Sequence, residues 1–272
     1  MVNLARVPRR FYAVEIAYEG GRFRGFQRQP GLPTIQAALE DALAAAGIRA
    51  PLAVAARTDA GVHALAQVVS FSTRADLDPQ HLRRALNAAL PDGIMALAVR
   101  RAAGAFHARA DALSRTYVYL VGAPAPEGLE GLAWSLPDPR AFPDLAAPRL
   151  DPAALRACLA AAVGSHDFRA FARPGEQRGT VRTVTRADVV SAEWAPLHAI
   201  VIEGRGFLRA MVRNLVGTAV TAAVGRAREG AIRDLLAAGA RYRGVRAPGW
   251  GLTLARVTYP PGRLEAEEER ER

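Results

Sequence analysis

The sequence predicts an α+β protein made of two similar halves. Residues 11–18 alternate between apolar and polar side chains, which indicates a half-buried strand, and apolar positions after Thr34 recur at helical spacing up to Gly47. From Arg115 onward, the chain repeats the order strand, helix, strand, strand, helix, strand with different residues. This order is that of a split βαβ unit, so each half is expected to adopt a ferredoxin-like arrangement.

The remaining elements follow from capping and turn residues. Asp78 and Pro79 begin a helix that Pro91-Asp92-Gly93 ends, because proline fits the first helical turn and glycine the residue after the last. The other strands expected in the first half are 51–55, 64–73 and 94–99. The second half is expected to contain strands at 115–121, 181–190, 198–203 and 252–257, and helices at 151–163, 208–224 and 232–238.

The two halves define the expected domain organisation. Residues 1–105 form an N-terminal α+β half, and residues 106–262 form a C-terminal one. If the open edges of their sheets meet, one mixed, mainly antiparallel sheet results, with helices on one face and the other face free to line a cleft. Residues 122–150 contain six prolines and are expected to be a surface excursion, and residues 263–272 are expected to be a solvated, charged tail.

Composition narrows the class of partner. The formal charge is +10 and the pI is about 10.9, an excess that favours a polyanion such as RNA or DNA. All of the basic charge is arginine, however, and together with abundant alanine, glycine and proline this indicates coding bias as much as adaptation. Charge alone therefore leaves nucleic acid binding open.

Several classes of protein and site are not expected. No apolar run approaches the roughly 18 residues of a membrane helix, and the arginines near the N-terminus precede no apolar core, so we expect a cytoplasmic protein. Cys158 is the one cysteine and is expected to be a buried small hydrophobe. The sequence has no P-loop, no glycine-rich dinucleotide turn and no zinc-binding spacing, so neither a metal nor a nucleotide cofactor is expected.

The densest polar segment lies between two apolar strands. This loop contains Arg57, Thr58, Asp59 and Gly61, and His63 follows it. On spacing alone the segment is an Asx turn, in which Asp59 accepts backbone N–H groups and Gly61 supplies a positive φ. The alternative is a catalytic loop that holds a base, a hydroxyl and an acid together.

Two further polar segments lie in the second half or lead into it. One runs over 106–109 and 114–117, where the simplest interpretation of Tyr117 is an aromatic residue on an edge strand. The other, 204–217, combines an apolar helix face with Arg209 and Arg213 at a spacing of four, which usually marks a solvated helix face.

In the same order over residues 11–259, these segments resemble the tRNA pseudouridine synthase A family. Arg-Thr-Asp-Ala-Gly-Val-His-Ala at 57–64 is its most specific signature, and Met-Val-Arg-Asn at 211–214 supports it. One departure is Phe26, where the family commonly has tryptophan, although both side chains are aromatic. The other matching motifs are Tyr18-Glu19-Gly20, Gly25-Phe26-Gln27-Arg28-Gln29, Thr34-Ile35-Gln36, Gly164-Ser165-His166-Asp167-Phe168 and Ala247-Pro248.

The resemblance implies two α+β halves merged into one mixed sheet with a basic RNA cleft, in a homodimer that acts on tRNA. Asp59 is then the essential carboxylate, and Arg213 is its ion-pair partner. Arg57 would help to hold the flipped base, and Tyr117 would stack against the target uracil. The residues expected to contact the RNA are Arg22, Arg24, Arg28, His63, Arg109 and Arg205.

The implied reaction is the isomerisation of uridine to pseudouridine at positions 38, 39 and 40 of the tRNA anticodon stem-loop. Asp59 could attack C6 or C1′ as a nucleophile, or remove the 2′ proton as a base, and the sequence leaves all three routes open. The alternatives are a base-excising glycosylase and a non-catalytic RNA-binding or RNA-folding protein. A carboxylate that faces a phosphate-binding cleft only weakens a pure binding protein, which favours the synthase.

Overall fold

Two compact units make up the chain in this computed structural model, which describes residues 8–146, 148–173, 175, 179–239 and 244–265. The first unit comprises Met1–Ala60, Ala64–Leu113 and Val257–Arg272. The second comprises Gly61–His63 and Ser114–Arg256. The segment that follows residue 105 therefore packs with the first unit as far as Leu113.

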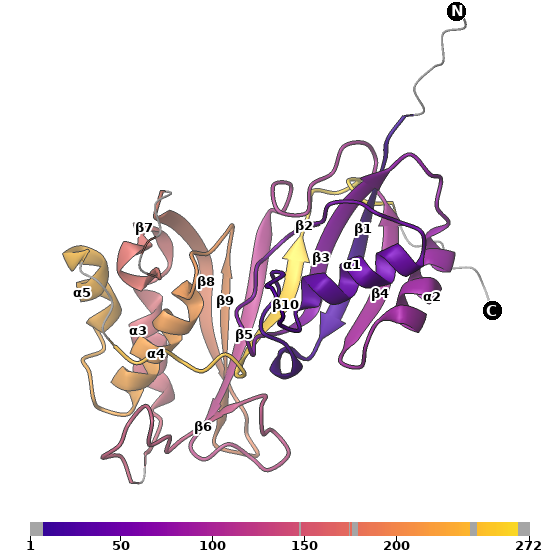
Figure 1. Cartoon of the computed structure of the whole chain (residues 1–272). Coiled ribbons are helices and arrows are strands. Elements are labelled where there is room, and N and C mark those ends of the chain that lie inside the picture. Colours follow the sequence, from indigo (N-terminus) through magenta and orange to yellow (C-terminus); the bar gives the residue numbers. More distant parts are fainter. Residues whose placement is uncertain (1–7, 147, 174, 176–178, 240–243, 266–272) are drawn as a thin grey trace, which may run out of the picture. The chain divides into compact units, whose positions relative to one another are not determined.

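The first unit contains the strand and helix order that the sequence predicts. Its elements in chain order are β1 (Arg10–Tyr18), the 3-10 turn η1 (Gly20–Arg22), α1 (Ile35–Ala45), β2 (Ala53–Val54), β3 (His63–Thr73), α2 (Pro79–Ala89) and β4 (Ile94–Arg101). The strands lie in the order β4-β1-β3-β2, and each pairing is antiparallel. Helices α1 and α2 contact each other on one face of these strands (Figure 1).

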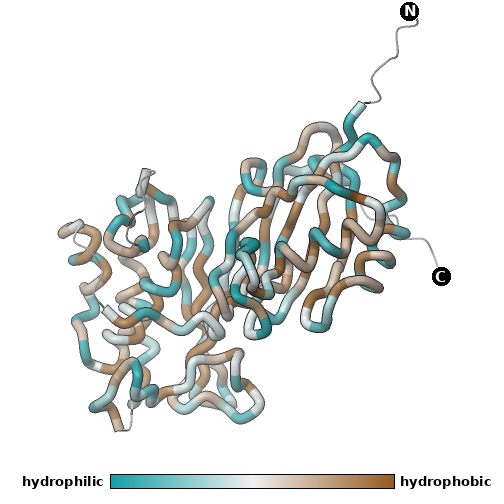
Figure 2. Tube along the Cα trace, in the orientation of Figure 1, coloured by the Kyte–Doolittle hydropathy of each residue, from teal (hydrophilic) through white to brown (hydrophobic). Residues whose placement is uncertain are grey.

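Capping residues begin both of these helices where the sequence predicts. The Thr34 hydroxyl accepts a hydrogen bond from the backbone N–H of Ala37, and the Asp78 carboxylate accepts from the N–H groups of Gln80 and His81. These bonds satisfy donors that the first turn of a helix leaves unpaired. Hydrophobic residues are frequent along the strands, whereas many turns are hydrophilic (Figure 2).

The second unit repeats the same strand order with additions. Its elements are β5 (Ser114–Gly122), β6 (Trp134–Ser135), α3 (Pro152–Ala160), β7 (Gly164–Asp167), the 3-10 turn η2 (Phe168–Phe171), β8 (Val181–Ser191), β9 (Leu197–Gly204), α4 (Met211–Ala223), α5 (Ala231–Ala238) and β10 (Leu252–Thr258). The order β10-β5-β9-β8 corresponds, strand by strand along the chain, to β4-β1-β3-β2 of the first unit. Helix α3 contacts β8 and packs against α4.

Strand β10 takes its last two residues from the first unit and the others from the second. The strand order of the chain is β4-β1-β3-β10-β5-β9-β8-β7, with β2 on β3 and β6 parallel to β5. The α+β class and the mixed, mainly antiparallel sheet are therefore confirmed.

Local structure departs from the prediction at several places. The helix expected at 208–224 begins only at Met211, because Ala210 has a φ of 64°, a left-handed conformation that an α-helix does not contain. The strand expected at 51–55 shortens to the two residues of β2. Strand β7 was not predicted, since its four residues show no apolar alternation and pair only because β8 offers an open edge.

The proline-rich segment 122–150 has many exposed residues, as a surface excursion would, but it also contains a small buried core that was not predicted. Trp134 is 1% exposed, forms β6 with Ser135 and stacks on Phe142 with ring centroids 5.9 Å apart. Its indole N–H donates to the carboxylate of Asp138 at 3.0 Å. Burial opposes the charge of Asp138, but hydrogen bonds from Trp134 and Arg140 outweigh it and lower the pKa of this carboxyl group. Proline prevents a long helix here but does not prevent the aromatic side chains from forming a small core.

The charged tail expected at 263–272 is bound over the part that the structure describes. Leu264 pairs with Ala102 through a β-bridge and packs against an apolar cluster of the first unit. The Arg263 guanidinium lies 2.6 Å from the carboxylate of Asp111. Residues 266–272 lie outside the described residues. The glutamate-rich composition gave no sign that Leu264, which is half-buried, packs against this cluster.

Cys158 is fully buried, as predicted, and burial raises the pKa of its thiol. Within the described residues, no helix combines the length and apolar character that crossing a membrane requires.

Replacing Trp134 with alanine should lower the free energy of unfolding by about 3–5 kcal/mol, the usual effect of truncating a buried aromatic side chain. Met95 is 58% exposed on β4. Met95→Ala is therefore the control and should change stability by no more than about 0.5 kcal/mol. Urea denaturation followed by circular dichroism measures both variants. Equal effects of the two substitutions would contradict a buried core in the 122–150 segment.

Candidate active site

The loop at 56–61, which connects β2 to β3, is held at its start by a buried glutamine. Gln67 lies on β3 and is 0% exposed. Its side-chain carbonyl accepts from the backbone N–H of Ala56 at 3.2 Å, and its amide donates to the Ala56 carbonyl at 2.7 Å. Because the amide engages both backbone groups of one residue, it fixes the direction in which the loop leaves the sheet.

The same glutamine connects to the middle of the loop through a tyrosine. The Gln67 amide donates to the Tyr18 hydroxyl at 3.3 Å, and this hydroxyl lies 2.7 Å from the Thr58 hydroxyl. Burial raises the pKa of Tyr18 to about 12 despite these two hydrogen bonds. The phenol therefore stays neutral and keeps a proton for hydrogen bonding. Thr58 itself is 8% exposed.

A second segment of the first unit packs directly on the loop. The backbone N–H of Phe26 donates to the Thr58 carbonyl at 3.1 Å. Gly25 has a φ of +92°, and a Cβ atom there would lie 3.1 Å from both the Thr58 carbonyl oxygen and the Ala60 nitrogen. Only glycine permits both this conformation and this approach.

The loop presents charged side chains from this rigid base. Asp59 is half-buried, and Arg57 is exposed, while Thr58 between them is buried. Gly61 has the positive φ, +80°, that an Asx turn was expected to need. Gln67, Tyr18 and Gly25 were not assigned this supporting role from the sequence. The one signal for Gln67 was its place among the apolar residues Leu65, Ala66, Val68 and Val69.

In the second unit, Tyr117 is buried with 8% exposure and meets Phe207 edge to face, with ring centroids 5.4 Å apart. Two residues earlier on β5, Arg115 is 6% exposed and donates to the Arg205 carbonyl at 2.5 Å. This bond holds the segment after β9 that carries Phe207. The sequence alone gave Arg115 no role.

Arg213 lies half-buried on α4 and is bound to the segment before β10. Its Nε donates to the Ala247 carbonyl at 2.8 Å, and the Ala247 N–H donates to the Arg213 carbonyl at 3.2 Å. Burial raises the pKa of Tyr119, and the positive charge of Arg213 opposes that rise. The guanidinium is thus an oriented group and not a solvated surface arginine.

The residues expected to contact RNA have different environments. His63 is 6% exposed, and its Nε2 lies 2.9 Å from the carbonyl oxygen of Gly131. Arg22 pairs with Glu19 at 2.9 Å, and Arg28 pairs with Glu40 at 2.6 Å. Arg22 and Arg28 are exposed despite these ion pairs, and Arg24, Arg109 and Arg205 are exposed as well.

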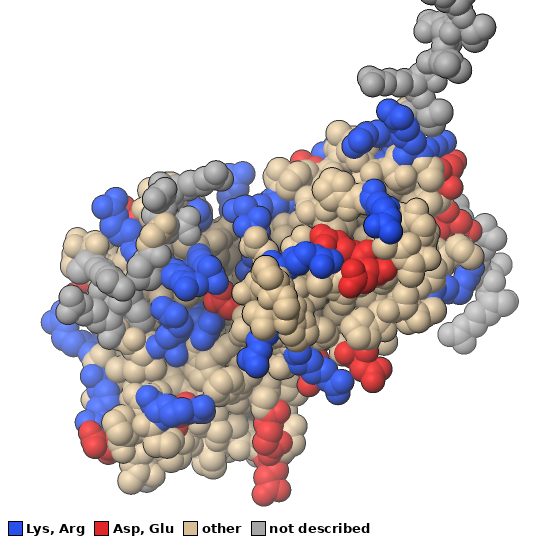
Figure 3. Space-filling model, in the orientation of Figure 1, with Lys and Arg blue, Asp and Glu red and all other residues tan. Residues whose placement is uncertain are grey.

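The predicted site residues thus fall into two groups. The first unit holds Arg22, Arg24, Arg28, Arg57, Asp59 and Arg109, and the second holds His63, Tyr117, Arg205 and Arg213. The pairing of Asp59 with Arg213 joins the two groups and stays a prediction. Arginine side chains spread widely over the face drawn in Figure 3, where acidic side chains are fewer.

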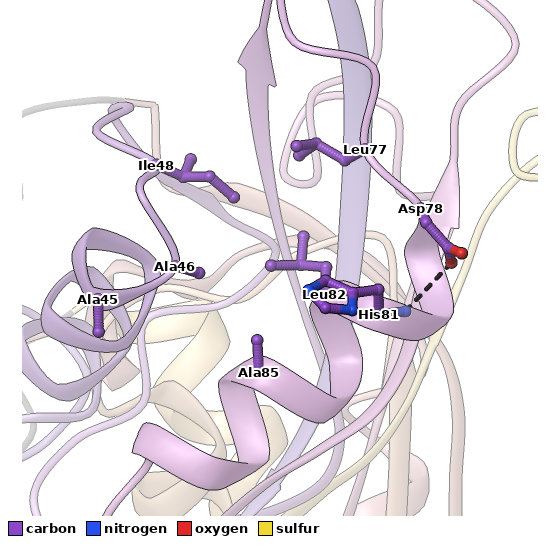
Figure 4. Close-up of a pocket in the computed structure, with 8 residues that line it drawn as sticks. All are labelled: Ala45, Ala46, Ile48, Leu77, Asp78, His81, Leu82 and Ala85. Carbon is purple, nitrogen blue, oxygen red and sulfur yellow. Dashed lines mark hydrogen bonds between the residues drawn. The ribbon is translucent and has the colours of Figure 1, made fainter.

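A pocket of about 300 Å³ lies between the end of α1 and the start of α2 (Figure 4). Apolar residues form most of its wall, and the Asp78 carboxylate there already caps α2. None of the predicted site residues lines it. Within the described part of the chain, no group of three or more histidine, cysteine, aspartate or glutamate residues could hold a metal ion.

A half-buried carboxylate in a rigid loop, beside an exposed arginine and in a strongly basic chain, is typical of enzymes that act on nucleic acid. A family model described as tRNA pseudouridine synthase matches residues 15–109 and 159–260. The chain therefore belongs to the tRNA pseudouridine synthase family, which is a family of isomerases. The resemblance of the polar segments to this family is confirmed.

Curated relatives cover nearly the whole chain. The tRNA pseudouridine synthase A of Methylacidiphilum infernorum is 38% identical over 266 residues, which are 96% of this chain and 98% of the relative. The tRNA pseudouridine synthase A of Frankia casuarinae is 41% identical, over 91% of this chain and 89% of that protein. That of Chloroflexus aurantiacus is 39% identical, with 97% of this chain and 94% of its own covered.

Gly25→Ala should displace the loop and reduce pseudouridine formation at least tenfold, because the new Cβ meets the backbone of Thr58 and Ala60. Gly31→Ala is the matched control, since Gly31 also has a positive φ but faces open space. It should lose about 1 kcal/mol of stability and keep its activity. Assays of both purified variants on an unmodified tRNA transcript measure this difference. Similar activity losses in both would show that the close approach at Gly25 is unimportant.

Proposed function

We propose that this chain isomerises uridine to pseudouridine in the anticodon stem-loop of tRNA, at positions 38, 39 and 40, with Asp59 as the catalytic carboxylate. Family membership supports the reaction type. The observation that carries the assignment of Asp59 is the loop itself: buried hydrogen bonds to Ala56 and Thr58 hold its backbone and leave Asp59 half-buried. A general acid, base or nucleophile needs this fixed position.

The reaction requires one well-placed carboxylate and no cofactor. The bond from C1′ to N1 of uridine breaks, a bond from C1′ to C5 forms, and the proton lost from C5 is balanced by one gained at N1. No electrons are exchanged with another molecule. Asp59 acts as a nucleophile at C6 or C1′, or as a base at the 2′ position, and each route requires its ionised form.

Arg213 is proposed to keep Asp59 ionised. A base-sized pocket excludes water and would raise the pKa of a carboxyl group within it. A guanidinium beside the carboxylate opposes this rise and orients the oxygen atoms. The hydrogen bond from Arg213 Nε to the Ala247 carbonyl supports this role, because it fixes the plane of the guanidinium.

The target uridine is stacked in its stem-loop and must flip out before it reacts. We propose that Arg57 holds the flipped state and that Tyr117 contacts the uracil. Tyr117 is only 8% exposed, so full stacking requires the uracil to displace atoms that now cover the ring. Stacking of a base on an aromatic ring contributes roughly 1–3 kcal/mol, which offsets much of the free energy needed to flip the base.

Exposed arginines are proposed to bind the RNA backbone. Arg24, Arg109 and Arg205 are exposed, so their guanidinium groups are available to phosphates. Arg22 and Arg28 should contribute less, because each already pairs with a carboxylate. His63 is proposed to act through the loop it follows, since its ring is buried against the Gly131 carbonyl.

Asp59→Asn should abolish pseudouridine formation while tRNA affinity stays within about threefold, because the amide keeps the size of the side chain but cannot act as a base or nucleophile. Nucleoside chromatography of digested tRNA measures the product, and filter binding measures affinity. An active Asp59→Asn variant would contradict the assignment of Asp59 as the catalytic carboxylate. Free uracil released by the native chain would instead identify a glycosylase, and binding without any reaction would identify an RNA-binding or RNA-folding protein.

The cellular role is proposed to lie in the cytoplasm. Mapping of pseudouridine in tRNA from cells that lack this protein tests the target positions directly. Loss of the modification at 38, 39 and 40 is expected, and loss elsewhere alone would assign a different substrate site.

We also propose a homodimer, and the second unit offers a surface for it. On β5 and β9, Val118 lies opposite Val201, and Leu120 lies opposite Ala199. Ala199 in turn lies opposite Val190 of β8. These side chains alternate with fully buried neighbours, so they share the opposite face of the sheet. Val190 is 55% exposed, and the other four are half-buried.

Val201→Arg should convert a dimer into a monomer in sedimentation velocity, because it places a charge in the middle of this apolar face. Met95→Arg, on the exposed side of β4, is the control and should leave the oligomeric state unchanged. A native chain that sediments as a monomer at micromolar concentration would overturn the homodimer.

A further inference from the structure

The segment before β10 is bound closely to α4. The backbone N–H of Ala247 donates to the Arg213 carbonyl, and Arg213 Nε donates back to the Ala247 carbonyl at 2.8 Å. One turn further along α4, Gly217 allows a very close approach, because a Cβ there would collide with the carbonyl oxygen of Val245. Residues 245–247 therefore have a fixed position on the helix.

Within this segment, Arg246 is exposed but has an oriented side chain. Its Nε donates to the side-chain oxygen of Asn214 at 3.1 Å. Asn214 is 0% exposed, and its amide nitrogen donates to the Phe171 carbonyl at 2.8 Å. Because both ends of the amide are engaged, the oxygen must face Arg246. A buried residue thus sets the direction of an exposed guanidinium.

This environment differs from that of two other exposed arginines, Arg169 and Arg228. Arg169 and Arg228 pair with carboxylates of Asp167 and Asp234, which neutralise them. Arg246 is held by a neutral amide, and in the described part of the chain no carboxylate is recorded within ion-pair distance of it. Its positive charge is therefore retained, and its two terminal amino groups stand on the side away from Nε.

A guanidinium that is held at Nε and exposed at its terminal amino groups matches a phosphate group. The two terminal groups form a planar fork that can donate two parallel hydrogen bonds to phosphate oxygens. Fixing the fork in advance reduces the conformational entropy lost on binding. Arg246 is also one residue from Ala247, to which Arg213 is bound. A phosphate on Arg246 would thus lie beside the group proposed to serve Asp59.

We propose that Arg246 binds a backbone phosphate of the RNA next to the uridine that reacts, and that Asn214 is the positioning residue for it. The inference rests on the proposed function, because it takes tRNA as the ligand and Arg213 as part of the site. Arg246 was not among the residues that the sequence led us to expect in contact with RNA.

Arg246→Gln tests the phosphate contact in equilibrium binding of an unmodified tRNA transcript between about 50 and 200 mM salt. Affinity should fall about tenfold, the lower end of what a charge-assisted hydrogen bond to a charged group contributes. The slope of log affinity against log salt should become shallower by about 0.7 to 0.9, which corresponds to one phosphate. Arg84→Gln, an exposed arginine on α2, is the matched control and should bind within twofold of the native chain.

Arg246→Lys tests the planar fork and the Nε donor through which Asn214 orients it. Lysine keeps the charge, so the salt slope should return to the native value, but it lacks the fork and the Nε donor, so affinity should stay at least threefold weaker. Unchanged affinity and slope in Arg246→Gln would overturn the phosphate contact, and native affinity in Arg246→Lys would overturn the positioning by Asn214. Pseudouridine formation by the native chain, measured on the same preparation, separates these outcomes from failure of the proposed function itself.

Discussion

The hydrogen bonds of the Gln67 amide are the interaction on which the candidate active site depends. They hold both backbone groups of Ala56 and, through the Tyr18 hydroxyl, reach Thr58. A buried amide left without partners would be unfavourable by about 1–3 kcal/mol, so the loop and the sheet must form together. The position of Asp59 is therefore a consequence of packing inside the first unit.

The second unit uses the same physical device at a different place. Asn214, like Gln67, is 0% exposed and engages both ends of its amide. Gln67 orients the loop of a carboxylate, and Asn214 orients an exposed arginine. In each unit, a charged group thus lies on a segment that hydrogen bonds anchor to a regular element, β3 in the first and α4 in the second. Fixed polar groups of this kind are what catalysis and phosphate binding both require.

Much of the fold was predictable because it depends on local periodicity and capping. The strands and helices of both units have the predicted order, and Thr34 and Asp78 cap their helices as expected. The errors lie where tertiary packing overrides local preference. Trp134 is buried within a proline-rich segment, and Ala210 has a left-handed conformation that delays α4. Neither the burial of Trp134 nor the conformation of Ala210 is visible as a periodic pattern in the sequence.

The sequence by itself determined the fold class, the family and the polar segments that contain Asp59 and Arg213, because side-chain type and spacing are local properties of the chain. The tertiary structure alone decided which residues support them. Gln67 lies 49 residues after Tyr18 in the chain, and Arg246 lies 32 residues after Asn214. The pairing of β1 with β3 and the packing of α4 against the segment before β10 bring such partners together. No pattern of neighbouring residues in the sequence encodes these contacts.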